Sequence, residues 1–99
     1  MELGWMKPTA ALVNTSRGPI VEETALIDAL STGAIRAAAV DVYDVEPLPA
    51  DHPYRRIENL LTTPHVGYVT EESYRVFYGQ MVESISAWAT GTPIREIAS

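Results

Sequence analysis

Four side chains with the chemistry of a catalytic site stand at the ends of three apolar segments. Arg17 follows the first segment (residues 10–13), and Asp41 lies near the end of the second (residues 37–43). Glu46 comes shortly after Asp41, and His65 follows the third segment. An imidazole titrates near neutral pH, and a guanidinium can hold an anion in two parallel hydrogen bonds. Brought to one edge of a sheet, a cation, two carboxylates and an imidazole would form a catalytic constellation.

The elements that must position these groups begin with a strand, a helix and a second strand. Residues 10–13 are apolar without alternation, which is typical of a parallel strand covered on both faces. Residues 21–30 show helical spacing, with two glutamates at the N-terminal end and Gly33 as a C-terminal stop. Residues 37–43 then predict a second buried strand. This order predicts a βαβ unit.

The second half of the chain predicts a long loop, a short strand and a long helix. Residues 44–59 hold three prolines and predict a loop with one short helical turn. Residues 60–63 predict a third strand that ends at Pro64, and Thr70 fits the N-cap of a helix that ends near Gly91. We interpret the apolar stripe of this helix as core or interface rather than a cofactor site. The stripe consists of Tyr74, Phe77, Met81, Ile85, Trp88 and Ala89.

Alternating strands and helices favour an α/β fold with a parallel sheet. In such sheets the chemistry gathers beyond the carboxyl ends of the strands, here residues 14–18, 41–46 and 64–68. The sequence has neither a Gly-x-Gly-x-x-Gly motif after a strand nor a P-loop, so it predicts no phosphate cradle. Three strands also predict an incomplete sheet.

Composition narrows the class of protein. The 99 residues allow one small domain, and the net charge of −6 disfavours nucleic acid and anionic membranes as partners. The absence of cysteine excludes disulfides, thiol nucleophiles and thiolate metal sites, and we predict no metal. Without an apolar run of about 18 residues or a secretory signal at its start, we expect a soluble cytoplasmic protein.

Three ordered segments resemble the NAD-dependent D-2-hydroxyacid dehydrogenases, and the match spans almost the whole chain. They are residues 6–18 (MKPTAALVNTSRG), residues 39–43 (AVDVY) with 46–49 (EPLP), and residues 59–67 (NLLTTPHVG). The resemblance implies a partial Rossmann-type sheet, the C-terminal half of an NAD-binding domain, with residues 1–99 forming a single partial domain. It implies that the long helix leads back towards a substrate domain. We also expect the protein to be a homo-oligomer.

The resemblance also implies roles for individual residues. Arg17 would bind the substrate carboxylate and polarise its carbonyl, His65 would be the general acid/base, and Glu46 would be the carboxylate partner of His65. The substrate would be a 2-hydroxy or 2-keto acid and the cofactor NAD, with NADP left open. Tyr68 departs from the small residue more often found at its position. The residues implied on the cofactor side are Thr15, Ser16, Arg17, Asp41, His65, Val66, Gly67 and Tyr68.

Each candidate also has a purely structural interpretation. Arg17 could be solvated or cap a helix, and Asp41 and Glu46 could be ordinary turn carboxylates. His65 could be a satisfied loop histidine. We assign His52 to the surface, because it lies in the proline-rich loop away from any strand end.

Three functional hypotheses follow. The first is a truncated hydride-transferring oxidoreductase that is inactive by itself. The second is an interaction module that dimerises through an exposed sheet edge, because an unpaired edge strand is a template for another chain. The third is a regulatory protein that binds a small acid through Arg17 without catalysis.

Overall fold

The computed structural model describes residues 2–98. The chain divides into two compact units, Met1–Gly67 and Tyr68–Ser99, and each is described by itself. The prediction that residues 1–99 form one partial domain stays a prediction.

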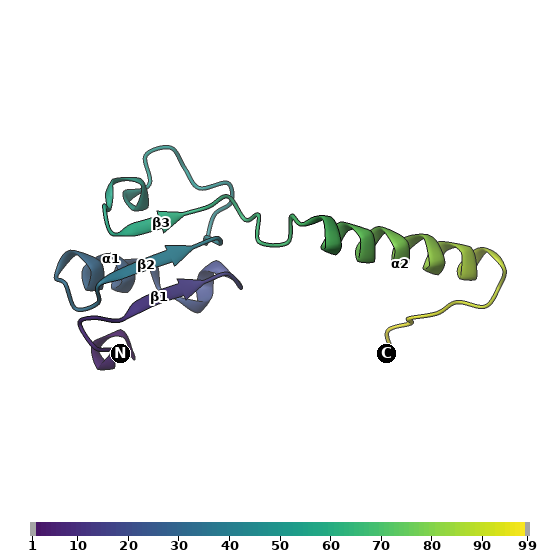
Figure 1. Cartoon of the computed structure of the whole chain (residues 1–99), viewed down its shortest axis with the longest axis horizontal. Helices are drawn as coiled ribbons and strands as arrows, with labels where there is room; N and C mark the ends of the chain where they lie inside the picture. Colours follow the sequence, from purple (N-terminus) through teal and green to yellow (C-terminus); the bar gives the residue numbers. More distant parts are fainter. Residues whose placement is uncertain (1, 99) are drawn as a thin grey trace. The chain divides into compact units, whose positions relative to one another are not determined.

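A three-stranded parallel sheet forms the centre of the first unit (Figure 1). Its strands are β1 (Ala11–Asn14), β2 (Ala37–Val40) and β3 (Leu60–Thr62), in the order β1-β2-β3. Helix α1 (Glu23–Ser31) connects β1 to β2, which confirms the predicted βαβ unit. The short 3-10 helices are η1 (Glu2–Trp5), η2 (Gly18–Ile20) and η3 (Pro53–Arg56). The last of these is the helical turn expected in the proline-rich loop.

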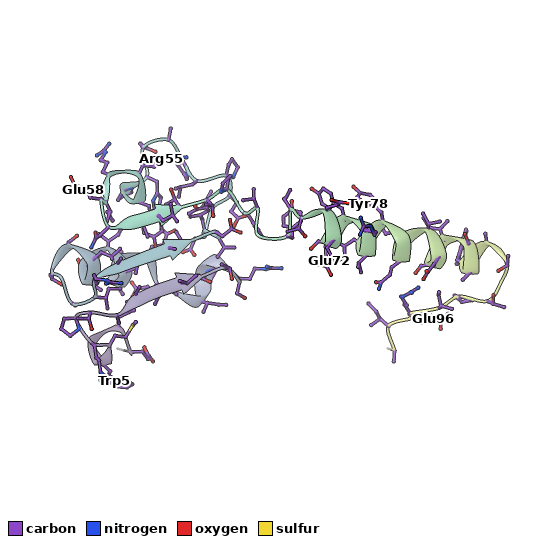
Figure 2. All side chains as sticks on the ribbon, viewed as in Figure 1. Trp5, Arg55, Glu58, Glu72, Tyr78 and Glu96 are labelled. Carbon is purple, nitrogen blue, oxygen red and sulfur yellow. The ribbon has the colours of Figure 1, made fainter. Side chains whose placement is uncertain are left out.

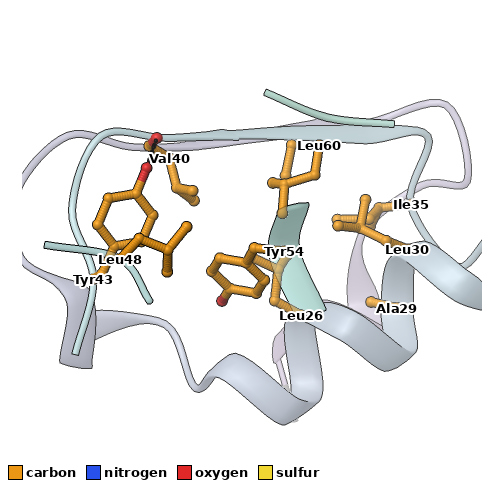
Figure 3. Packing of buried hydrophobic residues seen from close by; sticks show 10 residues of the cluster. Leu26, Ala29, Leu30, Ile35, Val40, Tyr43, Leu48, Tyr54 and Leu60 are labelled. Atoms are coloured by element: carbon orange, nitrogen blue, oxygen red, sulfur yellow. Dashed lines mark hydrogen bonds between the residues drawn. The ribbon is translucent and has the colours of Figure 1, made fainter. Parts of the chain in front are cut away.

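The hydrophobic core lies between one face of the sheet and α1 (Figure 3). Leu26 of α1 and Ile35 before β2 have no exposed surface. Tyr54 of η3, and Tyr43 and Leu48 of the loop after β2, belong to the same cluster. The clustered residues are Leu26, Ala29, Leu30, Ile35, Ala38, Val40, Tyr43, Leu48, Tyr54 and Leu60.

The opposite face of the sheet is open, so the expectation of strands covered on both faces is wrong for the described residues. Val13 of β1 and Leu61 of β3 are 67% and 65% exposed. Both pair with Ala39 of β2, so the three residues form one row across the sheet. Side chains alternate between the two faces of a strand, and α1 packs on the face that carries Val40 and Leu60.

Strand and helix boundaries differ slightly from the predicted ones. The first strand begins and ends one residue later than expected, and the second ends at Val40 rather than Tyr43. After Val40, the Asp41 N–H still donates to the Asn14 carbonyl at 3.0 Å, whereas the Tyr43 N–H donates to the Glu46 side chain. Helix α1 ends at Ser31, and Gly33 adopts the left-handed conformation (φ 71°) expected of a helix stop.

The prediction that His52 is a surface residue is wrong. Its side chain is 15% exposed, and its Nε2 lies 3.0 Å from Oε2 of Glu23 in α1. Its Nδ1 accepts a hydrogen bond from the Tyr54 backbone N–H at 3.2 Å, which caps η3. His52 therefore joins the proline-rich loop to the start of α1.

Helix α2 (Glu71–Ala89) makes up most of the second unit. Thr70 is its N-cap, as predicted, and accepts a hydrogen bond from the Ser73 N–H at 3.0 Å. Gly91 (φ 77°) follows its end. Figure 2 shows the side chains along this helix, with Glu72 and Tyr78 labelled.

The apolar stripe of α2 does not form core in the described structure, because the helix has no buried residue. Met81, Ile85 and Trp88 of the stripe are all exposed. The interpretation of the stripe as core or interface therefore stays a prediction. Within these residues, no helix combines the length and the apolar character needed to cross a membrane.

Candidate active site

The turn after β1 is shaped by a buried asparagine and presents Arg17 to solvent. Asn14 accepts a hydrogen bond from the Ser16 N–H at 3.2 Å, and its Nδ2 donates to the Arg17 carbonyl at 2.9 Å. An asparagine side chain that bonds to the backbone of the second residue after it commonly stabilises a turn. The Arg17 side chain is exposed, and one Nη donates to the Ser16 carbonyl at 2.7 Å. The other guanidinium donors can meet a bound anion.

Gly18 holds this turn against the end of the second strand. A Cβ at position 18 would lie 2.5 Å from the Asp44 nitrogen and closer still to the carbonyl group of Tyr43. Only a glycine allows the two backbones to approach so closely. The close contact places Arg17 next to the segment that carries Glu46.

Asp41, at the end of β2, fastens the loop that follows β3. Its carboxylate accepts hydrogen bonds from Thr63 Oγ1 at 2.5 Å and from the N–H groups of Val66 and Gly67, each at 2.9 Å. The Thr63 bond is the largest cause of a lowered pKa for Asp41, and the Val66 bond follows, against the opposing effect of burial. Asp41 is therefore ionised, and its carboxylate holds the residues before and after His65. We call this set of three hydrogen bonds the Asp41 clamp.

His65 lies inside this loop and pairs with Glu46. Its Nδ1 is 2.7 Å from Oε2 of Glu46, whose Oε1 accepts the Tyr43 N–H at 3.0 Å. The His65 hydrogen bond is the largest cause of the lowered pKa of Glu46, the Tyr43 N–H is the next, and the charge of Arg17 adds to them. Because Glu46 is ionised and can only accept, Nδ1 of His65 carries a hydrogen.

The backbone of His65 adopts a positive φ of 56°, which is uncommon for a residue other than glycine. Its N–H donates to the Thr63 carbonyl at 3.1 Å, so the chain turns tightly around Pro64. The hydrogen bonds to Asp41 hold the residues on either side of this turn. Such conformations persist when the surroundings determine them, and they gather at functional sites.

A cavity of about 260 Å³ lies beside the His65–Glu46 pair. Both side chains line it, as does the Arg55 side chain, which donates to the carbonyls of Leu48 and Pro49 at 2.7 and 2.8 Å. Within residues 2–98, no group of three or more His, Cys, Asp or Glu side chains is placed to hold a metal ion.

The first unit thus brings together all but one of the residues implied by the resemblance. Tyr68 begins the second unit, and its carbonyl accepts the Thr70 N–H at 2.9 Å in the turn before α2. Its contact with a cofactor stays a prediction. Sequence reasoning missed Asn14, Tyr43 and Thr63. The turn-forming run from Asn14 to Gly18 could have indicated Asn14, whereas no local pattern indicates the long-range bonds of the other two.

A model of one protein family matches residues 1–67 of the chain. It is described as the NAD binding domain of the D-isomer specific 2-hydroxyacid dehydrogenases. The chain belongs to this family. The predicted family and its partial Rossmann-type sheet are thereby confirmed.

The chain is also similar to characterised and solved proteins. It is 42% identical over 91 residues to glyoxylate/hydroxypyruvate reductase B of Yersinia enterocolitica, covering 92% of this chain and 28% of that protein. D-lactate dehydrogenase with NAD+ from Lactobacillus jensenii matches with a TM-score of 0.84 at 30% identity, covering 99% of this chain and 33% of the other. A 2-hydroxyacid dehydrogenase from Xanthobacter autotrophicus Py2, in complex with NADPH and MES, matches at TM-score 0.76 and 37% identity, covering 98% and 39%.

The family domain is NAD-binding, which confirms the predicted cofactor, and the NADPH complex of one relative agrees with leaving NADP open. The contacts of individual residues with such a cofactor stay predictions. Thr15, Ser16, Val66 and Gly67 are exposed at the carboxyl edge of the sheet. A Cβ on Gly67 would lie 3.1 Å from Asp41 Oδ2, so a larger residue would press on the clamp. The sequence has no glycine-rich motif that would bind the phosphates of the cofactor.

Proposed function

We propose that this chain supplies the proton-transfer and substrate-carboxylate groups of an NAD-dependent 2-hydroxyacid dehydrogenase. The substrate class is a small 2-keto acid or the matching 2-hydroxy acid, as the glyoxylate/hydroxypyruvate reductase name of its Yersinia relative suggests. The chain spans 28% of the length of that relative, and the complete activity belongs to the whole enzyme. The observation that carries the proposal is the 2.7 Å hydrogen bond between His65 and Glu46, one of whose oxygens is held by the backbone.

His65 is the proton-transfer residue of this proposal. With Nδ1–H directed at the Glu46 carboxylate, Nε2 is the ring atom that exchanges a proton with the substrate oxygen. During reduction of a 2-keto acid, Nε2 gives its proton to the carbonyl oxygen as the alcohol forms. During oxidation it removes the hydroxyl proton, and the adjacent carboxylate stabilises the resulting imidazolium.

Arg17 is the substrate-binding residue. A guanidinium can hold a carboxylate through two parallel hydrogen bonds, and its charge also polarises a carbonyl next to that carboxylate. The Arg17 charge contributes to the lowered pKa of Glu46, which indicates that the two groups act in one electrostatic environment.

Thr15, Ser16, Val66 and Gly67 would hold the nicotinamide end of the cofactor. When bound, the cofactor supplies or accepts the hydride. The Asp41 carboxylate keeps the backbone of the 66–67 segment in place through its two backbone hydrogen bonds. Without a phosphate cradle in its sequence, we expect the isolated chain to turn over substrate negligibly.

NADH fluorescence titration of the purified chain tests the cofactor assignment. We expect weak, saturable binding that Gly67→Ala reduces, because the added Cβ would lie 3.1 Å from Asp41 Oδ2, which is held by its own hydrogen bonds. Gly79→Ala is the matched control, since a Cβ at Gly79 meets nothing within 4 Å. No binding at millimolar NADH, or equal effects of the two substitutions, would contradict the assignment.

An interaction module is the second candidate, and the open sheet favours it. The strands β1 and β3 are the edges of the described sheet, and Val13 and Leu61 are exposed on its uncovered face. Light scattering on the same sample gives the mass. A stable dimer without NADH binding supports the module, and a monomer that binds NADH supports the enzyme.

A further inference from the structure

The phenol of Tyr43 links the ends of β2 and β3. Tyr43 is 6% exposed, and its hydroxyl lies 2.6 Å from the Thr63 carbonyl and 3.3 Å from the Val40 carbonyl. Figure 3 shows the ring within the core, with its oxygen directed to Val40 at the end of β2. A hydroxyl has one hydrogen to donate, and the shorter distance assigns it to Thr63.

The Thr63 carbonyl also belongs to the turn that presents His65. It accepts the His65 N–H at 3.1 Å, next to the positive φ of His65. A residue in this conformation needs neighbours that determine it. The Tyr43 phenol therefore holds the acceptor on which the His65 turn closes.

The main chain of Tyr43 holds the other member of the pair. Its N–H donates to Oε1 of Glu46 at 3.0 Å, while Oε2 of Glu46 meets Nδ1 of His65 at 2.7 Å. One residue thus bonds to Glu46 through its backbone and to the His65 turn through its side chain. The distance between Glu46 and His65 therefore depends on the backbone N–H and on the hydroxyl of Tyr43.

We propose that Tyr43 is a positioning residue for proton transfer, whose phenol keeps the His65 turn at hydrogen-bonding distance from Glu46. The role of the His65–Glu46 pair in proton transfer rests on the proposed function. The effect of Tyr43 on the distance between His65 and Glu46 does not. A phenylalanine would fill the same space without anchoring the Thr63 carbonyl. His65 would then have a wider range of positions relative to Glu46.

The protonation state of Tyr43 suits this role. Burial is the largest cause of its raised pKa, and the charge of Asp41 is the next. The phenol consequently keeps its hydrogen throughout the neutral range and remains a donor to Thr63.

NMR titration of the 99-residue chain, with 13C in its side-chain carboxyl groups, tests the proposal in Tyr43→Phe. We expect the pKa of Glu46 to rise towards its ordinary value, because the His65 hydrogen bond is the main cause of its depression. Tyr54→Phe is the matched control. Tyr54 is also buried, and its ring centre lies 6.4 Å from that of Tyr43, but its backbone bonds are to His52 and Ile57 rather than to the pair.

An unchanged Glu46 titration in folded Tyr43→Phe would overturn the proposal, as would an equal rise in Tyr54→Phe. If Tyr43→Phe does not fold, the unsubstituted chain labelled with 13C at tyrosine Cζ gives the answer. The Tyr43 Cζ signal should then change at the Glu46 midpoint, and its absence there would overturn the proposal. Neither measurement uses cofactor or turnover, so a failure of the proposed function remains distinguishable from a failure of this inference.

Discussion

Substituting Gly18 by alanine should disrupt the contact between the two strand ends that carry Arg17 and Glu46. The added Cβ would lie 2.5 Å from the Asp44 nitrogen and closer to the Tyr43 carbonyl, all of which are backbone atoms. Ordinary carbon contacts begin near 3.5 Å, so the two backbone segments must separate by more than about 1 Å. Overpacking of this kind typically costs about 1–3 kcal/mol, and this site has no flexible side chain to absorb it.

Thermal unfolding followed by circular dichroism measures the effect. For a domain of this size about 1 kcal/mol corresponds to roughly 4–8 °C, so we expect Tm to fall by about 4–24 °C. Gly4→Ala is the control, since a Cβ at Gly4 meets nothing within 4 Å, and it should change Tm little. A Gly18→Ala chain with the Tm of the wild type would refute the close approach of these segments.

Two further predictions concern the core and the ionised clamp. Leu26 has no exposed surface, so Leu26→Ala should lower the free energy of unfolding by about 3 kcal/mol in a urea titration; a loss under about 1 kcal/mol would show that the core is not packed around it. Asp41 and Glu46 have lowered pKa values in the folded chain, so the unfolded chain takes up their protons first as the pH falls. Their contribution is complete above the ordinary carboxyl range of about 3.9–4.3 and is lost as the pH falls through the folded-state values. We therefore expect Tm to decrease below about pH 4, and less steeply in Asp41→Asn than in the wild type; parallel pH profiles of the two proteins would contradict the clamp.

Local sequence signals predicted the helices and the order of the elements well. The threonine N-cap at residue 70 and the left-handed glycines at positions 33 and 91 are local devices, and each is confirmed. The apolar segments also indicated the parallel sheet, because a strand, a helix and a strand of these lengths can pack in few ways.

The open face of the sheet could not be predicted in the same way. A run such as residues 10–13 shows that a strand is apolar, but the side chains that cover each face come from distant parts of a chain. The small alanines of β2 hide the alternation that would distinguish a half-covered strand. His52 was misplaced for a similar reason, because its partner Glu23 is 29 positions away in the sequence.

The candidate site combines what the resemblance implied with contacts that only the structure shows. Glu46 and His65 are paired, as their implied roles require. Asp41, implied to face the cofactor, has a carboxylate that accepts three hydrogen bonds from the loop around His65. The phenol of Tyr43 could not have been identified, since an aromatic residue after a strand is ordinarily a core residue.

We propose above that His65 and Arg17 supply the proton-transfer and substrate-binding groups of a 2-hydroxyacid dehydrogenase. The most direct test replaces the matching 91 residues of the Yersinia enterocolitica reductase by those of this chain and follows NADH oxidation with glyoxylate. We predict turnover in the chimera that falls at least about 100-fold in His65→Gln. His52→Gln, the only other histidine variant, should retain turnover. A folded, NADH-binding chimera that turns over equally with and without His65 would contradict the claim.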